Sequence, residues 1–180
     1  MWVVKIGGSL YDAPQLKMWL NKIAASGVPV IIVPGGGPFA DQVRVAQQRW
    51  GVDDGTAHQM ALCAMNQFGL LMTGIEPQLS RASKIPELIK QVESGRSVVW
   101  LPVEEDPDVE QSWRVTSDSL ALWLAKQVDA EGVLLVKSAT LTTSSSELLD
   151  AAFEEYRQGW GGEVKLVQRD AIHEWPSLII

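Results

Sequence analysis

Cysteine is almost absent from the sequence, which excludes a fold held together by internal disulfide bonds. The one cysteine, Cys63, has no second cysteine with which to pair. Its neighbours from Ala61 to Met65 are apolar and predict a helix. We therefore expect Cys63 to be a buried, inert thiol rather than a catalytic nucleophile.

Basic residues are also in short supply. The chain has 15 lysines and arginines against 22 aspartates and glutamates, which gives a formal net charge of −7. Broad, non-specific binding to nucleic acid requires a basic surface, so we expect no nucleic-acid partner. A small anionic substrate stays compatible with this charge, because a local pocket can oppose the sign of the whole molecule.

Long hydrophobic runs are missing as well. No apolar stretch approaches the ~20 residues that a membrane-spanning helix needs. The chain reaches Lys5 and its glycines within its first eight residues, a pattern unlike that of a signal peptide. We therefore expect a cytoplasmic protein with no membrane partner.

What the sequence does contain is enough apolar material for one well-filled core. Of its 180 residues, 46% are hydrophobic and eight are tryptophan. An apolar strand over 2–6, an amphipathic helix over 16–23 and a nearly continuous apolar run over 28–33 form a strand–helix–strand unit. Such a unit is typical of a parallel sheet that is covered on both faces. We predict one α/β domain spanning residues 1–180.

Further apolar patterns continue this alternation. They predict helices over 39–50, 56–73, 84–92 and 147–158 and strands over 97–101, 132–137 and 163–167. Thr116 or Ser117 is expected to cap another helix, and the Ser- and Thr-rich segment 138–146 to form a loop. The wide apolar face of 56–73 predicts either deep packing or a dimer seam. The acidic segment 102–111 predicts either a solvated loop or a loop that attracts Mg²⁺.

The first strand carries one lysine, Lys5, and runs directly into Gly7, Gly8 and Ser9. Glycines let the backbone turn sharply and approach a ligand closely, because no Cβ is in the way. Peptide N–H groups in such a turn can hold phosphate oxygens, with a lysine beside them as a point charge. The same residues also fit a plain strand-to-loop turn with a solvent-facing lysine.

A second glycine loop, Gly35-Gly36-Gly37, follows the second strand. Parallel strands place their carboxyl ends at one edge of the sheet, where α/β proteins bind ligands, so both loops are expected there. Asp118, near a predicted helix start, and Lys137, at a predicted strand end, can reach the same edge. Together these groups supply what phosphoryl transfer requires: N–H groups for phosphate oxygens, lysines for developing charge and a carboxylate that holds the lysines. Neither loop is a Walker A or dinucleotide-binding motif.

Three motifs, in order along the chain, resemble those of the amino acid kinase superfamily. They are Val4-Lys5-Ile6-Gly7-Gly8-Ser9, Val33-Pro34-Gly35-Gly36-Gly37 and Thr116-Ser117-Asp118-Ser119-Leu120-Ala121. The chain looks most like the short kinases of methanofuran biosynthesis and their bacterial relatives in one-carbon metabolism, which phosphorylate an aminomethylfuran-methyl phosphate. The residues of this closer match are Ser9-Leu10-Tyr11-Asp12, the segment 34–41, His58 and the segment 116–119. The resemblance implies a three-layer αβα sandwich around a mainly parallel sheet, with a shortened C-terminal lobe.

The resemblance also implies a division of the chain and of its chemistry. An acceptor-side lobe would span 1–112 and an abbreviated nucleotide-side lobe 113–180. Lys5 would neutralise the transferring phosphoryl group, and Asp118 would orient Lys5 and a second cation. The residues implied to bind the nucleotide phosphates are Gly7, Gly8, Ser9 and Lys137, and those implied to face the acceptor are Gly35, Gly36 and Gly37.

Two further residues are implied to contact the acceptor, and each has a second explanation. His58 fits a contact with an acceptor phosphate or a packing histidine on an apolar helix. Asp41 fits a substrate contact or a capping-turn carboxylate. The implied cofactors are ATP and Mg²⁺, with no metal-ligating side chain assigned. The implied partner is a small-molecule phosphoryl acceptor, and we expect a homo-oligomer, a dimer or higher.

The nucleotide half departs from the family pattern. After Lys137 the chain continues Ser138-Ala139-Thr140-Leu141, where larger members carry an acidic, glycine-containing loop. The downstream motif with a second catalytic lysine has no clear counterpart, and Lys165 lies within a predicted strand. The sequence therefore leaves two functions open. One is an ATP-dependent kinase whose small acceptor is expected to be a phosphate monoester, and the other is a catalytically degenerate binding or structural subunit of the same fold.

Overall fold

A parallel β-sheet forms the centre of the computed structural model, which describes residues 1–138 and 148–180. Within these residues the sheet has six strands in the order β3-β4-β2-β1-β5-β6, and every adjacent pair is parallel. In chain order the strands are β1 (Trp2–Ile6), β2 (Val30–Pro34), β3 (Ser80–Ala82), β4 (Val98–Trp100), β5 (Gly132–Lys137) and β6 (Glu163–Gln168). The predicted α/β class is confirmed.

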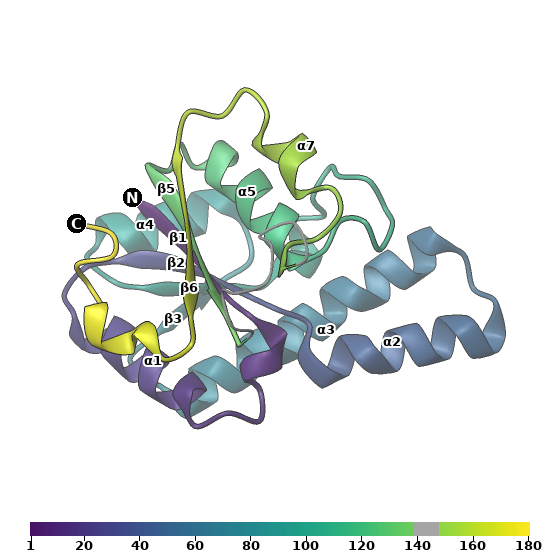
Figure 1. Cartoon of the computed structure of the whole chain (residues 1–180), viewed down its shortest axis with the longest axis horizontal. Coiled ribbons are helices and arrows are strands. Elements are labelled where there is room, and N and C mark those ends of the chain that lie inside the picture. Colours follow the sequence, from purple (N-terminus) through teal and green to yellow (C-terminus); the bar gives the residue numbers. More distant parts are fainter. Residues whose placement is uncertain (139–147) are drawn as a thin grey trace.

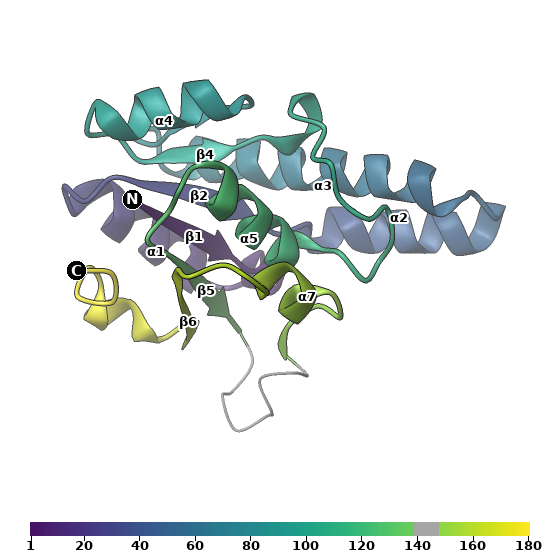
Figure 2. The ribbon, with the colours of Figure 1, turned by 90° about the horizontal axis from the view of Figure 1, so that it is seen from above.

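Helices connect the strands and cover both faces of the sheet (Figures 1 and 2). The α-helices are α1 (Gln15–Ala25), α2 (Gly37–Trp50), α3 (Asp54–Ile75), α4 (Ile85–Glu93), α5 (Ser117–Gln127) and α7 (Phe153–Arg157). The 3₁₀ helices are η1 (Gly8–Leu10), η2 (Pro102–Glu104) and η3 (Ala171–Glu174). Among the described residues, no helix has the length and apolar character needed to cross a membrane.

Residues of β1 alternate between the two faces of the sheet, and each face packs against different helices. Val3 belongs to a core that it shares with α4 and α5, where Leu122 is fully buried. Val4 belongs to a core that it shares with α1 and the later part of α3, where Trp19 is fully buried. Burial on both faces explains why the central strands are continuous apolar runs. The predicted three-layer αβα sandwich is confirmed.

The central strands end in register at one edge of the sheet. Ile6 at the end of β1 lies opposite Pro34 of β2 and Val136 of β5. Gly7 and Gly35, the residues that follow β1 and β2, therefore lie side by side, with Lys137 next to them. Both glycine loops are at the same edge, as the parallel arrangement predicts.

The two glycine loops pack against each other through their backbones. A Cβ built on Gly8 would lie 2.3 Å from the backbone nitrogen of Gly37, and a Cβ built on Gly35 would lie 2.3 Å from the backbone nitrogen of Gly8. Real Cβ atoms do not approach backbone so closely, so no larger residue fits at these two positions without movement of the chain. Glycine is therefore required here by loop–loop packing, whatever ligand approaches.

Three sequence predictions differ from the structure. Cys63 is exposed rather than buried, because α3 turns its inner face at Leu62, Met65 and Met72 toward the sheet and Cys63 points away from it. Strand β3 was not predicted, since three residues are too few to show an alternating pattern. The helix predicted over 147–158 is shorter in the structure: residues 149–152 are not helical, and α7 covers Phe153–Arg157.

Part of the sequence prediction lies outside the described residues. The Ser- and Thr-rich loop predicted over 138–146 has only Ser138 in the described part, and the predicted helix 147–158 begins at a residue that is not described. The segment Ala139-Thr140-Leu141, at which the chain departs from the family's usual nucleotide loop, is likewise not described. The parts of these predictions that fall on residues 139–147 stay untested.

Gly35→Ala is expected to lower the free energy of unfolding by about 1–3 kcal/mol, because the added Cβ has to displace the backbone of the other glycine loop. Gly74 of α3 gives the matched control, since a Cβ built there meets no atom within 4 Å. Gly74→Ala is expected to leave the stability unchanged or to raise it by up to about 1 kcal/mol. Chemical denaturation measures both variants, and equal stabilities would contradict the loop–loop packing.

Candidate active site

A carboxylate shared by two lysines lies at the edge of the sheet where the glycine loops meet. Lys5 Nζ is 2.7 Å from Asp118 Oδ1, and Lys137 Nζ is 2.6 Å from Asp118 Oδ2. Lys5 comes from β1 and Lys137 from the adjacent strand β5, so both extend from neighbouring strands toward α5, which carries Asp118 in its first turn. The side chains of Lys5 and Asp118 are 5% and 4% exposed, so the first of these ion pairs is buried.

The three charges shift one another's proton affinity. Burial by itself would raise the pKa of Asp118, but the positive charges of Lys5 and Lys137 outweigh it and hold that pKa below its ordinary value. Burial, reinforced by the nearby charge of Lys5, lowers the pKa of Lys137 to about 8 against the attraction of Asp118. Below that pH the cluster holds two positive charges and one negative charge. Its surplus positive charge favours an anion at this edge.

A second carboxylate, Asp150, fixes the turn that carries Asp118. It accepts hydrogen bonds from the backbone N–H of Thr116 at 2.8 Å and of Ser119 at 3.0 Å. The hydroxyls of Thr116, at 2.9 Å, and of Ser119 donate to the same carboxylate. An N-cap residue ordinarily accepts such bonds itself, but the side chain of Thr116, the N-cap of α5, caps no N–H. Asp150 is therefore a capping group supplied from a distant part of the chain.

Sequence reasoning missed Asp150 for a physical reason. It lies 34 residues after Thr116 and 31 residues after Ser119, so no local spacing connects them. The pairing of Lys137 with Asp118, in contrast, agrees with the prediction that one carboxylate holds the lysines. The sequence predicted that Asp118 holds Lys5 and a second cation, and the structure provides Lys137 as that cation.

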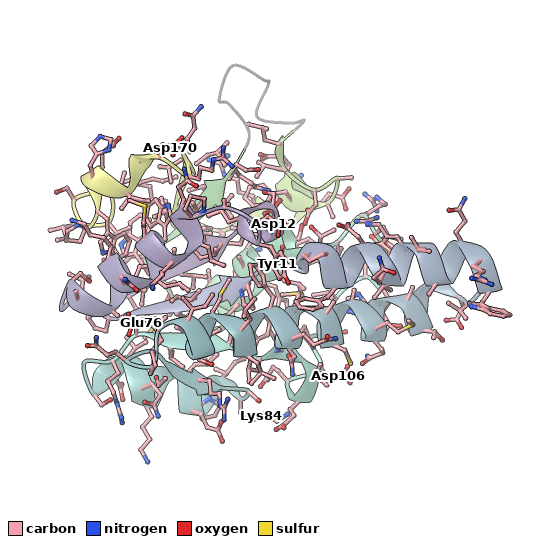
Figure 3. All side chains as sticks on the ribbon, turned by 90° about the horizontal axis from the view of Figure 1, so that it is seen from below. Tyr11, Asp12, Glu76, Lys84, Asp106 and Asp170 are labelled. Atoms are coloured by element: carbon pink, nitrogen blue, oxygen red, sulfur yellow. The ribbon has the colours of Figure 1, made fainter. Side chains whose placement is uncertain are left out.

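A cavity of about 380 Å³ opens beside this cluster, between η1, the beginnings of α2 and α5, and α3. We call it the α2–α3 cavity, because residues of both helices line it. The two helices pack side by side (Figure 1). Six of the predicted site residues line it: Gly8, Ser9, Gly36, Gly37, Asp41 and His58. Its lining also includes residues that were not assigned from the sequence: Tyr11, Asp12, Arg44 and Trp113. Figure 3 shows Tyr11 and Asp12 close to the beginning of α2.

The other predicted glycines lie behind the cavity and complete the sheet. The backbone N–H of Gly7 donates to the carbonyl of Val136 at 3.0 Å, and that of Gly35 donates to the carbonyl of Ile6 at 2.9 Å. These N–H groups are therefore already used. In the first turns that begin at Gly8 and Gly37, N–H groups have no acceptor within their own helix, so they are the candidate donors for an anion.

His58 contributes a buried, neutral imidazole to the cavity wall. The residue is 6% exposed, and its Nε2 has no hydrogen-bond partner among the described residues. Burial lowers the pKa of His58 below its ordinary value, although the charge of Asp106 acts in the opposite direction. Both interpretations of this histidine therefore remain: it packs into α3 and it presents its ring to the cavity.

The comparison with known proteins places the chain in a family. A model described as the amino acid kinase family matches residues 1–140. The chain belongs to this family. Over 140 residues it is 33% identical to the (5-(aminomethyl)furan-3-yl)methyl phosphate kinase of Methanocaldococcus jannaschii, and the match covers 75% of this chain. It covers 64% of that curated relative, so this member of the family spans less than two thirds of the relative's length.

Solved structures of uridylate kinases have the same fold as this amino acid kinase family member. The uridylate kinase from Archaeoglobus fulgidus superposes with a TM-score of 0.74 at 14% identity, over 96% of this chain and 95% of the other. The UMP kinase from Bacillus anthracis gives a TM-score of 0.71 at 15% identity, over 94% of this chain and 87% of the other. At such identities the similarity concerns the fold alone.

Asp150→Ala is expected to lower the free energy of unfolding by about 1–3 kcal/mol, because it removes the cap of α5 and leaves two backbone N–H groups without an acceptor. Glu154→Ala gives a matched control, since it removes a carboxylate from the same segment that forms only an exposed pair with Arg157. The control is expected to change stability by at most about 0.5 kcal/mol. Urea denaturation monitored by circular dichroism compares the two, and an equal loss in both would show that the cap is not stabilising.

Proposed function

We propose that this amino acid kinase family member transfers the terminal phosphoryl group of ATP to a small-molecule acceptor that is a phosphate monoester. The observation that carries the proposal is the carboxylate of Asp118 held between Lys5 and Lys137 at the edge where both glycine loops meet. An acceptor like that of the Methanocaldococcus jannaschii kinase, an aminomethylfuran-methyl phosphate, fits the size of the α2–α3 cavity.

Phosphoryl transfer needs positioning and charge stabilisation more than covalent help from the protein. Lys5 and Lys137 each have an ammonium group that can donate to oxygens of the transferring group, and Asp118 holds the two at a fixed separation. Asp150 holds the turn that carries Asp118 in place and acts as a positioning residue. The N–H groups at the start of η1 and α2 would bind phosphate oxygens on either side of the transferring group.

Mg²⁺ fits this site as an ion brought in by the nucleotide. Among the described residues, no group of three or more His, Cys, Asp or Glu side chains is placed to hold a metal ion. Mg²⁺ commonly keeps several waters and is bound by substrate phosphates with one or two carboxylates, so a preformed protein cage is not required. When bound, it would neutralise phosphate charge.

Two observations support a catalytic role over the degenerate binding subunit. The chain has no clear counterpart of the family's downstream motif with a second catalytic lysine, but Lys137 of β5 provides a second ammonium group that pairs with Asp118. The unpartnered Nε2 of His58 lies in the wall of a cavity of substrate size, which is typical of a site that binds a polar ligand. The role of His58 at the acceptor phosphate, that of Asp41 at the acceptor and the division into lobes at 112 stay proposals.

A homo-oligomer also stays a prediction. Large apolar side chains are exposed on the α2–α3 helix pair, at Val45, Trp50, Leu70 and Leu71. Trp50 is 73% exposed, which is unusual for an isolated surface and favours a partner there. A cytoplasmic location likewise stays a prediction.

The direct test is a transfer assay with labelled ATP, Mg²⁺ and a panel of phosphate monoesters that includes the aminomethylfuran-methyl phosphate. Lys5→Ala is expected to lower kcat by about 10²-fold or more, because it removes one of the two ammonium groups at the transferring phosphoryl group. Lys17→Ala, which removes an exposed lysine of α1, is the control and is expected to retain wild-type kcat. Retained turnover in Lys5→Ala would refute the assigned mechanism. No transfer to any acceptor and no binding of MgATP by calorimetry would favour the degenerate subunit.

The pH profile tests Lys137 separately. Because its pKa is lowered to about 8, kcat/KM for ATP is expected to be high below that pH and to fall above it, as the ammonium loses its proton. Lys137→Arg keeps the charge and is expected to move this fall to higher pH. Deprotonation of Lys137 does not itself promote unfolding, since its pKa is about 8 in the native state and 10.5 in the unfolded chain, so this group adds stability between those pH values. Circular dichroism over the same pH range checks that the protein stays folded. An unchanged alkaline limb in Lys137→Arg would exclude Lys137 as the titrating group.

A further inference from the structure

The α2–α3 cavity contains one cation to which the mechanism above gives no role. Lys5 and Lys137 are not among the residues that line the cavity, and Arg44 of α2 is the only lysine or arginine in its described lining. Asp12 and Asp41 belong to the same lining and carry negative charge. Without Arg44 the charged side chains of this lining would only repel an anionic acceptor.

The indole ring of Trp113 holds Arg44 in place. The central carbon of the guanidinium lies over this ring, 3.7 Å from the ring centre. The ring is itself fixed, because Trp113 Nε1 donates a hydrogen bond to the side-chain oxygen of Gln47, and Gln47 donates to Asp54 at 2.8 Å. Arg44 and Gln47 are three residues apart on α2, so they lie on the same face of the helix. A guanidinium that is already ordered loses less conformational freedom when it binds an anion.

Stacking leaves the hydrogen-bond donors of Arg44 free. The five N–H groups of a guanidinium lie in its plane, whereas the contact with Trp113 uses its face. In the described part of the chain, the arginines whose side chains form hydrogen bonds or ion pairs are Arg96, Arg114 and Arg157. Arg44 is not among them. It can therefore offer two parallel N–H groups to a phosphate, the geometry that a guanidinium favours.

A second polar side chain of the same lining lacks a partner. His58 is 6% exposed, and its Nε2 has no hydrogen-bond partner among the described residues. Burial lowers the pKa of His58 below its ordinary value, so the imidazole adds no positive charge near neutral pH. Buried polar atoms are normally hydrogen-bonded, which favours a polar ligand in this cavity. The charge that such a ligand meets from the lining cations is that of Arg44.

We infer that Arg44 binds the phosphate of the acceptor and that Trp113 positions Arg44 for this contact. The inference rests on the proposed kinase function and assigns acceptor recognition to a residue of the cavity. A guanidinium can pair with two oxygens of the acceptor phosphate, which leaves the third to attack the terminal phosphorus of ATP. The new bond forms as the bond to the ADP oxygen breaks, so no further reactant is needed. The charge of Arg44 also offsets the repulsion between the two substrates.

This role predicts an effect on the acceptor and not on the nucleotide. Arg44→Gln removes the charge and is expected to raise KM for the acceptor by about 10- to 30-fold, the lower range for a charged pair because Arg44 is exposed to solvent. KM for ATP is expected to stay unchanged. Arg44→Lys is expected to give an intermediate KM, since an ammonium group keeps the charge but cannot pair through two parallel bonds. A rise in KM for ATP instead would assign Arg44 to the nucleotide and overturn the inference.

Arg49 of the same helix provides the matched control. Its guanidinium also lies near a tryptophan, 5.3 Å from the ring centre of Trp50, but Arg49 does not line the cavity. Arg49→Gln is therefore expected to keep the wild-type KM for both substrates. An increase in acceptor KM equal to that of Arg44→Gln would show a general effect of charge on α2 and would overturn the specific contact.

The role of Trp113 is tested through Arg44. Trp113→Leu is expected to raise KM for the acceptor by about 3- to 10-fold, and Trp113→Phe is expected to restore most of the loss, because a ring again lies against the guanidinium. In the Arg44→Gln background, Trp113→Leu is expected to add no further change, since residues that act through one contact are not additive. The same increase in both backgrounds would show that Trp113 only supports local packing and would overturn its positioning role.

Calorimetry without ATP separates this inference from the proposed function. The probes are the aminomethylfuran-methyl phosphate and the corresponding alcohol, which lacks the phosphate. The wild type is expected to bind the phosphate more tightly than the alcohol, and Arg44→Gln is expected to reduce this preference by about 10- to 30-fold. That result supports Arg44 even if no phosphoryl transfer occurs, in which case the proposed function alone fails. An absent preference in the wild type, or a preference that Arg44→Gln leaves unchanged, would overturn the inference, while observed transfer would leave the kinase intact.

Discussion

The shared carboxylate of Asp118 is the constraint on which the rest of the site depends. Two ammonium groups cannot be brought together away from water unless an anion lies between them, and burying such charges is costly unless each one is paired. The pairing in turn requires β1 and β5 to be neighbours and α5 to begin above their carboxyl ends. The order of the central strands and the cap that Asp150 places on α5 are therefore parts of one electrostatic arrangement.

The glycine loops bring two chain segments together at the sheet edge, where side chains would not fit between them. Gly8 and Gly35 approach so closely that only hydrogen atoms fit between the loops. The N–H groups of Gly7 and Gly35 donate to sheet carbonyls, so the candidate donors for a ligand lie further along the chain, in the first turns that begin at Gly8 and Gly37. The same loops therefore pack against each other at the sheet edge and contribute Gly8, Gly36 and Gly37 to the lining of the cavity.

Much of this arrangement could be predicted from the sequence, and the exceptions have a common cause. The positions of Lys5, Lys137 and both glycine loops follow from strand ends in a parallel sheet, because there the local pattern already determines which edge a residue reaches. Asp118 was predicted from a helix start and from the resemblance to the family. The cap from Asp150 could not be predicted in this way, because it depends on a contact between segments that lie more than 30 residues apart in the sequence. The prediction that Cys63 is buried was wrong for a related reason. Its apolar neighbours indicated a buried helix, but only the packing of α3 decides which side of that helix is covered.

The acidic net charge and the anionic substrate are reconciled by where the charges lie. Of the cations that suit phosphate, Lys5 is buried and Lys137 is 14% exposed at the sheet edge, where the dielectric is low and each charge acts strongly over a short range. Asp12 and Asp41, which line the cavity, are exposed, so water and salt weaken their effect on an anion at the sheet edge. The net charge of the chain therefore does not predict the sign of the site, because the few cations at the sheet edge act strongly while the exposed carboxylates are screened.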